Sequence, residues 1–249
     1  MIQQTQENFS KPTGKKTTGK KATLKQFNND YFVKVTFYIT YVFLLTTATI
    51  TFIEAMRTSD NKIRHILNLE TCISVVAAFF YSKFIANIET RNASDIPLDY
   101  KSITIERYTD WMITTPIMLL VLCLVFVYNT KQSLNFFTFL LILLLNYAMI
   151  ISGFAGETGI ISNPYLSQFM GFFFFALLFG FLYFKFLAKK FNFDNEIIYF
   201  SFFILWAFYG VFYNMNHELR NIGYNVLDLL AKCFVGIFFW AYFTKVFTL

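Results

Sequence analysis

The chain has 249 residues, of which 56% are hydrophobic and 14% charged, with a formal net charge of +6. Its mean hydropathy is +0.49, whereas a soluble domain carries about 25% charged residues. This composition excludes a soluble globular protein and predicts an integral membrane protein with nearly all of its chain in the bilayer. Cys72, Cys123 and Cys233 lie in apolar stretches without metal-ligand spacing, so we expect free buried thiols and no metal site.

Residues 1–29 form a polar segment before the first apolar stretch, and lysines recur along it between threonines and glycines. No apolar core of a signal peptide separates this segment from residue 31, which argues against a cleaved signal peptide. We expect a disordered lysine-rich tail over 1–29 and a single membrane domain over 30–249. A targeting or lipid-surface role for the tail is the less favoured alternative.

Seven apolar stretches follow, each long enough to cross a hydrocarbon core of about 30 Å as a helix. They span residues 31–53, 66–88, 104–128, 133–155, 165–188, 196–216 and 221–247. The connectors between them are short, so neighbouring helices should run antiparallel and pack as one bundle. The predicted fold class is therefore all-α, a bundle of seven transmembrane helices.

Basic residues are spread unevenly over the connectors. The connectors 1–2, 3–4 and 5–6 and the C-terminal end carry Arg57, Lys62, Arg64, Lys131, Lys185, Lys189, Lys190 and Lys245. The remaining connectors carry only Arg91, Lys101 and Arg220. The positive-inside rule then places the N-terminus outside the cell. The lysine-rich tail argues for the opposite orientation, and we prefer the connectors because their bias is repeated.

Two of the stretches carry charged residues where lipid would be expected. Arg107 and Asp110 are one helical turn apart, and Asp228 and Lys232 are four residues apart on one face of the last stretch. A charge at the bilayer centre costs at least about 2.5–3.5 kcal/mol. Apolar packing would join the helices at lower cost than a structural ion-pair cluster, so we favour a functional role for these groups.

A buried lysine such as Lys232 is the residue type suited to a Schiff base with a carbonyl ligand. A protonated imine needs an anion nearby, and Asp110 and Asp228 would supply two, with Arg107 balancing the surplus negative charge. Aromatic residues and a glycine suit an elongated polyene beside this lysine. They are Trp111, Trp206, Tyr209 and Gly153.

These motifs resemble those of microbial (type 1) rhodopsins over the whole set of helices. The pattern Arg-Tyr-x-Asp-Trp-x-x-Thr-Thr-Pro occurs at 107–116 and Trp-x-x-Tyr at 206–209, although Gly210 stands where a proline is common. The first helix, "TYVFLLTTATITFIEAMRT", and Asn-x-x-Asp-x-x-x-Lys at 225–232 are similar to the group 1 viral rhodopsins of giant algal viruses. That group is associated with light-gated cation conductance.

The resemblance implies a mechanism. All-trans retinal would be bound covalently to Lys232, with Asp110 and Asp228 as counterions. Light would isomerise the retinal to its 13-cis form, after which the Schiff base proton would move to Asp110. The resemblance assigns counterion support to Arg107, Thr114 and Tyr81, the retinal pocket to Trp111, Thr115, Met118, Gly153, Trp206 and Tyr209, and gating to the pair Thr115 and Asn146.

The type of transport is read from a few further positions. Val121 stands where outward proton pumps of the family carry a carboxylate that re-protonates the Schiff base, which argues against a fast pump. Asp110 argues against a chloride pump and Thr114 against a sodium pump. Glu70 and Asn225, together with Arg107, are the expected ion pathway, because a polar file through a bundle suits passive ion flow. Cation-conducting relatives often carry a glutamate at the position of Ala77, which leaves the pore's selectivity open.

We therefore expect a light-gated cation channel rather than an enzyme, conducting Na⁺, K⁺ or H⁺ across a host cell membrane. A weak outward proton pump is the alternative. A photosensory rhodopsin comes third, since no signalling domain is attached. The expected partners are the lipid bilayer, the cations and a homo-oligomeric copy, with no nucleic acid.

Overall fold

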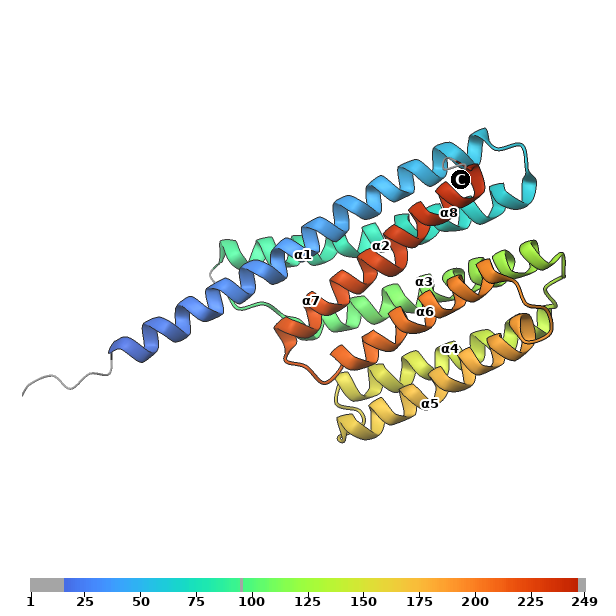
Figure 1. Ribbon diagram of the computed structural model, residues 1–249. Coiled ribbons are helices and arrows are strands. Elements are labelled where there is room, and N and C mark those ends of the chain that lie inside the picture. The colour runs from blue at the N-terminus through green and yellow to red at the C-terminus, as the bar shows by residue number, and fades with distance from the viewer. Residues whose placement is uncertain (1–15, 95, 246–249) are drawn as a thin grey trace, which may run out of the picture.

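The computed structural model of the protein describes residues 16–94 and 96–245, and these residues form helices joined by short connectors (Figure 1). The elements in chain order are α1 (Lys16–Arg57), α2 (Asn61–Ala93), α3 (Tyr100–Thr130), α4 (Phe136–Glu157), α5 (Pro164–Leu182), the π-helical turn η1 (Tyr183–Leu187), α6 (Phe193–Phe212), α7 (His217–Asp228), the π-helical turn η2 (Leu229–Phe234) and α8 (Val235–Thr244). The predicted all-α class is confirmed.

Seven membrane spans are found within the described residues, as the apolar stretches predict. They are Tyr31–Arg57, Asn61–Arg91, Tyr100–Thr130, Phe136–Glu157, Pro164–Leu187, Phe193–Phe212 and His217–Thr244. The last span is continuous through α7, η2 and α8. The orientation of the N-terminus stays a prediction.

The first helix begins earlier than the apolar pattern indicates. Backbone helix starts at Lys16, so residues 16–29, which we expected to be disordered, continue α1. No proline interrupts the chain between Lys16 and the first span, and lysine, alanine and leucine favour helix. The rest of the predicted tail, residues 1–15, lies outside the described residues.

Side-chain caps explain where most helices start. Asp99, Asn135, Asn163, Asn192 and Asn216 each precede a helix and accept a hydrogen bond from a backbone N–H of its first turn. Asparagine and aspartate are favoured at this position because they satisfy a donor that has no partner within the helix. The caps keep the connectors short, and consecutive spans consequently run antiparallel.

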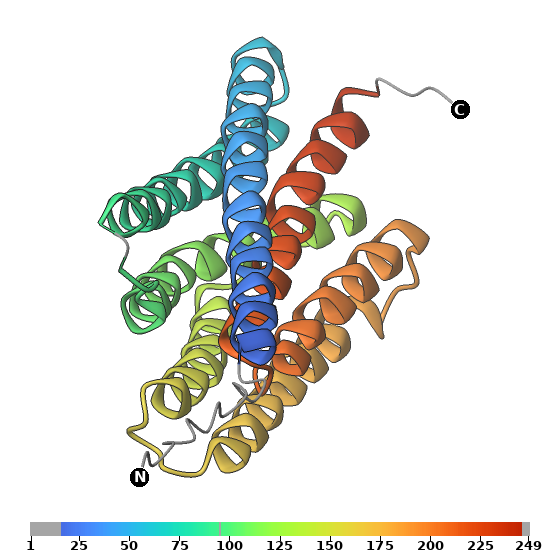
Figure 2. The same cartoon turned by 90° about the vertical axis from the view of Figure 1, so that its left-hand side faces the viewer.

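The helices form a bundle with two distinct sides. Helices α1 and α2 lie on one side with α7 and α8 beside them, and α4 and α5 form the opposite edge (Figure 1). Helix α3 lies between the two sides, next to α6 (Figures 1 and 2). This arrangement brings the charged faces of α3 and of the seventh span together in the interior.

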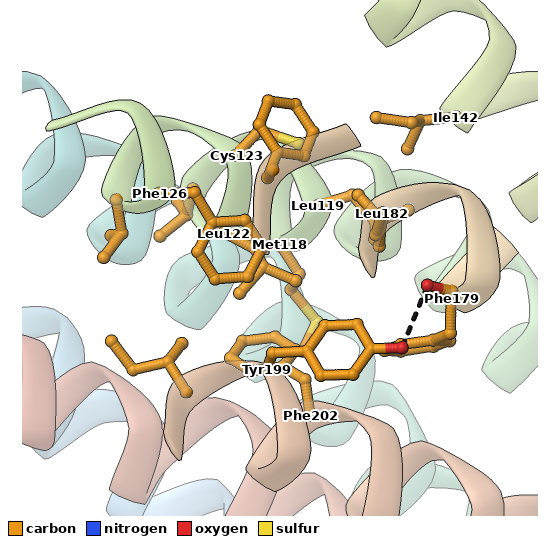
Figure 3. Close-up of a cluster of buried hydrophobic side chains, with 14 of the residues drawn as sticks. Met118, Leu119, Leu122, Cys123, Phe126, Ile142, Phe179, Leu182, Tyr199 and Phe202 are labelled. Atoms are coloured by element: carbon orange, nitrogen blue, oxygen red, sulfur yellow. Dashed lines mark hydrogen bonds between the residues drawn. The ribbon is translucent and has the colours of Figure 1, made fainter. Parts of the chain in front are cut away.

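A large apolar cluster fills the bundle between α3, α5 and α6. Figure 3 shows Leu119, Leu122 and Phe126 of α3 packed against Phe179 and Leu182 of α5, and the Tyr199 hydroxyl donates to the Phe179 carbonyl at 2.9 Å. Val121 lies in the same cluster and is fully buried. Apolar side chains therefore fill the space between these three helices.

The cysteines are free, but one of the predicted burial states is wrong. Cys123 and Cys233 are buried, whereas Cys72 is exposed on the outer face of α2. An apolar stretch in a membrane helix has a lipid-facing side as well as a core-facing side, so hydrophobic neighbours in sequence do not imply burial.

Candidate functional site

Lys232 and two carboxylates meet in the interior of the bundle. The Lys232 Nζ atom lies 2.6 Å from Asp110 Oδ2 and 3.5 Å from Asp228 Oδ1. Lys232 is 2% exposed and both aspartates are fully buried. Asp228 and Lys232 share a face of their helix, as the four-residue spacing predicts.

The backbone around this lysine departs from the regular α-helix. Residues Leu229–Phe234 form the π-helical turn η2, so Lys232 projects from a locally widened segment. Short π-helical segments occur frequently at functional sites. The sequence pattern did not reveal this turn, because an apolar run reads the same in either kind of helix.

Arg107 balances the second carboxylate. Its Nη1 atom lies 3.6 Å from Asp228 Oδ2, and its Nη2 atom donates to Asn225 Oδ1 at 2.8 Å and to Asn221 Oδ1 at 3.2 Å. The Tyr81 hydroxyl donates to Asp228 Oδ2 at 2.8 Å. The sequence analysis missed Asn221, although it lies one helical turn before Asn225 on the same face.

The hydroxyls of Tyr209 and Thr114 donate to different kinds of acceptor, a carboxylate and a backbone carbonyl. Tyr209 donates to Asp228 Oδ1 at 2.7 Å, so this expected pocket residue also holds a counterion carboxylate. Thr114 donates to the backbone carbonyl of Asp110 at 2.9 Å rather than to its carboxylate. Asp110 Oδ1 is buried without a hydrogen-bond partner among the described residues. The predicted support by Thr114 is thus limited to the Asp110 backbone.

A pocket opens beside Lys232. Its walls include every residue expected there from the sequence: Trp111, Thr115, Met118, Gly153, Trp206 and Tyr209. They also include residues that the sequence analysis left out, among them Tyr108, Met149, Ile150, Phe172, Phe175 and Tyr224. Most of these side chains are apolar or aromatic, and an amine and a carboxylate lie at one place in the wall.

A family model described as Bacteriorhodopsin-like protein matches residues 32–246. The chain belongs to this family. Members of the family bind retinal covalently through a lysine Schiff base, which confirms the predicted cofactor. No curated protein matches the chain.

Solved structures agree with this assignment. The crystal structure of viral rhodopsin OLPVRII is 51% identical in sequence, covers 87% of this chain and 99% of its own, and has a TM-score of 0.79. Blue light-absorbing proteorhodopsin from Med12 is 22% identical over 86% of this chain and 97% of its own, with a TM-score of 0.67. Xanthorhodopsin, described as a light-driven ion pump with dual chromophore, is 17% identical over 86% of this chain and 92% of its own, with a TM-score of 0.69. The last two show the fold alone, and membership of group 1 of the viral rhodopsins stays a prediction.

The pocket fits retinal on the evidence of its own walls. Small-molecule sites are mostly apolar with a few placed polar groups, and this pocket has a lining of that kind. A polyene aldehyde needs apolar walls along its length and an amine at one end. Lys232 is the only amine among the residues that line the pocket.

Two glycines shape the pocket by admitting an aromatic neighbour. A Cβ atom on Gly210 would lie 2.4 Å from the Phe172 ring, so a proline or alanine there would have to displace Phe172, itself a pocket residue. A Cβ atom on Gly153 would lie 2.8 Å from the Tyr108 hydroxyl. Gly210 therefore replaces the common proline where α6 approaches Phe172 closely.

The expected gating pair is in contact. Asn146 Nδ2 donates to Thr115 Oγ1 at 2.8 Å and thereby links α4 to α3. Thr115 in turn donates to the Trp111 carbonyl at 2.8 Å. The pair adjoins the pocket, and its role in gating stays a prediction.

Glu70 does not join the central charge cluster. It is 2% exposed, and the described residues offer its carboxylate no hydrogen bond or ion pair. A Cβ atom on Gly236 would lie 3.1 Å from Glu70 Oε2, and Gly236 follows Lys232 by one helical turn. Glu70 therefore lies beside the seventh span on the C-terminal side of the lysine, apart from Arg107 and Asn225.

Proposed function

We propose that the protein is a light-gated cation channel with retinal bound at Lys232. The observation that supports the proposal is a file of buried and half-buried polar side chains along α1, α2 and the seventh span. Retinal supplies light absorption and an isomerisation that disturbs the site. Asp110 is the carboxylate positioned to accept a proton from Lys232, because its Oδ2 atom lies 2.6 Å from Nζ. Loss of that ion pair changes which arrangement of the helices is favoured.

The file starts beside the central cluster. Asn225, a hydrogen-bond partner of Arg107, donates through Nδ2 to Thr36 Oγ1 at 3.0 Å. The Thr40 hydroxyl is buried and donates to the Asn225 carbonyl at 3.0 Å. Oxygen atoms of this kind can replace part of the hydration shell of a small cation.

The file continues towards the C-terminal end of the bundle. Thr47 lies 3.5 Å from the Cys233 carbonyl, and the Thr51 and Thr71 hydroxyls are hydrogen-bonded at 2.8 Å. Ser74 Oγ is buried without a partner among the described residues. From residue 36 to residue 51, α1 rises roughly 22 Å, most of a hydrocarbon core of about 30 Å. Polar groups thus follow most of the membrane thickness along α1, whereas an apolar cluster fills the space between α3, α5 and α6.

Photocurrents under voltage clamp test this proposal. We expect the light-induced current of retinal-loaded protein to reverse sign near the equilibrium potential of the conducted cation. Exchange of Na⁺ for K⁺ or for a large organic cation should move that potential. The Lys232→Ala variant should give no current and serves as the control.

Other photocurrent outcomes would overturn the channel proposal. A current that keeps its sign at every voltage would identify a pump, because a pump works against the gradient. Absence of current in well-expressed, retinal-loaded protein would identify a sensor instead. With external and internal solutions exchanged, the same recordings report the orientation of the chain, which we propose has its N-terminus outside.

A weak outward proton pump is the second candidate, and Glu70 is the observation that favours it. This buried carboxyl group lies near Gly236, one turn beyond Lys232, whereas Val121 lies in the apolar cluster and cannot hold a proton. A positioned acid typically contributes about 10²–10⁴-fold to a proton transfer. In a pump, Glu70 would return the proton to the Schiff base nitrogen.

Glu70→Gln separates the two candidates. For the channel, we expect a smaller photocurrent or a shifted reversal potential, with late photocycle rates changed less than tenfold. For the pump, re-protonation should slow by at least about a hundredfold. Glu54→Gln is the matched control, since Glu54 is an acid near the C-terminal end of α1 that contacts Arg57 at 3.7 Å. Transient absorption and voltage clamp on both variants distinguish the outcomes.

A further inference from the structure

A second cluster around a buried carboxylate lies at the end of the bundle opposite to the end of α8 (Figure 1). Glu157 is the last residue of α4, and its side chain is 2% exposed. Its Oε1 atom accepts hydrogen bonds from the Tyr108 hydroxyl at 3.0 Å and the Tyr224 hydroxyl at 2.9 Å. Its Oε2 atom lies 3.5 Å from Nε of Arg220. One carboxylate therefore joins α3, α4 and α7.

The local helix does not explain an acid at this position. The C-terminal end of a helix carries partial negative charge, which disfavours a carboxylate there. Glu157 is nevertheless buried at the end of α4, so its place depends on donors from other helices. An ion pair that only anchored the connector after α4 would need Arg220 alone. Here two tyrosine hydroxyls also donate to one carboxylate oxygen of Glu157.

Both of these tyrosines belong to the wall of the retinal pocket. Tyr108 and Tyr224 line it, and each ring packs edge-on against Trp111 with a centroid distance of 5.0 Å. Trp111 is itself a wall residue and directly follows Asp110. The hydroxyls of both tyrosines donate to Glu157, which does not itself line the pocket, so this carboxylate fixes two wall residues from outside the pocket.

Tyr224 also connects the cluster to the charged centre. The Arg107 guanidinium carbon lies 5.6 Å from the centroid of the Tyr224 ring. A cation over an aromatic face is attracted by the ring, so the orientation of the ring affects the position of the cation. The Tyr224 hydroxyl is fixed by Glu157, and Arg107 in turn approaches the counterion Asp228.

We propose that Glu157 is a positioning residue for the photochemistry. It does not line the pocket. It fixes the positions of Tyr108 and Tyr224. Through their ring contacts it also fixes Trp111 in the pocket wall and Arg107 beside Tyr224. Loss of Glu157 should therefore change the absorption maximum of the chromophore and its accessibility to solvent. These changes should occur in addition to any loss of stability.

The test uses full-length, retinal-loaded protein. We expect Glu157→Ala to shift the visible absorption maximum and to speed bleaching by hydroxylamine in the dark by at least about tenfold. Losing one ordinary hydrogen bond has about this effect, and the variant loses two. Glu157→Gln should have a smaller effect, because its amide oxygen still accepts from both tyrosines. If the alanine variant does not fold, the glutamine variant is compared with Tyr224→Phe.

A double-mutant comparison separates positioning from general destabilisation. Tyr224→Phe should shift the absorption maximum in the same direction as Glu157→Ala, and the double variant should add little to either. Glu89→Ala is the matched control, because Glu89 is an exposed acid at the same end that accepts the Tyr38 hydroxyl, and neither residue lines the pocket. An unchanged maximum and bleaching rate in Glu157→Ala, or fully additive shifts, would overturn the proposal.

Discussion

Replacing Lys232 by alanine is expected to leave the protein without a visible absorption band. Retinal absorbs in the visible range only as a protonated Schiff base, and Lys232 is the only amine among the residues that line the pocket. No other wall residue can form the same bond. The measurement is the absorption spectrum of purified protein after incubation with all-trans retinal.

The same substitution should also destabilise the protein. Asp110 would remain fully buried after losing the cation 2.6 Å away. Breaking a buried pair by removing one partner typically costs about 3–5 kcal/mol. The double variant Lys232→Ala/Asp110→Asn removes both charges, so it should regain much of this stability and remain colourless.

This pair of variants makes the linkage testable even if the single variant folds poorly. Lys83→Ala serves as the matched control, since Lys83 is exposed on α2 over the rings of Phe79 and Phe80. The control should keep full colour. A visible band in either Lys232 variant, after free retinal has been washed away, would show that the chromophore is attached elsewhere.

Much of the fold and the charged centre could be predicted from the sequence, because both depend on regular periodicities. Apolar stretches of sufficient length locate the spans, and helical spacing puts Asp228 beside Lys232. The motif at 107–116 adds Arg107 and Asp110 from another helix through resemblance to a family. These patterns survive small errors in helix boundaries, since the residues concerned lie about two turns or more inside their spans.

Other features could not be predicted, because they depend on which side of a helix faces which neighbour. Glu157 and Asn221 look like ordinary residues near connectors, yet antiparallel packing directs both into the interior. Cys72 illustrates the opposite error, since it is exposed although its neighbour Ile73 is buried. The hydroxyls of the polar file come from threonines and a serine scattered through two apolar helices, and only their shared side of the bundle relates them.

Asp110→Asn should shift the visible absorption band to the red. Excitation of a protonated retinal Schiff base moves positive charge away from the nitrogen, so a nearby anion stabilises the ground state more than the excited state. Removing the anion narrows the energy gap between the two states. The variant should also slow the light-induced loss of the proton from the Lys232 nitrogen, since its nearest acceptor is gone. Steady-state and transient absorption measure the two effects.

Asp228→Asn is the matched comparison, and the distances rank the two variants. Asp110 lies 2.6 Å from Lys232 Nζ, whereas Asp228 lies 3.5 Å away and also approaches Arg107 at 3.6 Å. Coulomb attraction falls with distance, and a carboxylate shared with a second cation contributes less at the first. The red shift should therefore be larger for Asp110→Asn than for Asp228→Asn. An unchanged spectrum in Asp110→Asn, or the reverse ranking, would assign the principal counterion to Asp228 and the nearby proton acceptor to another group.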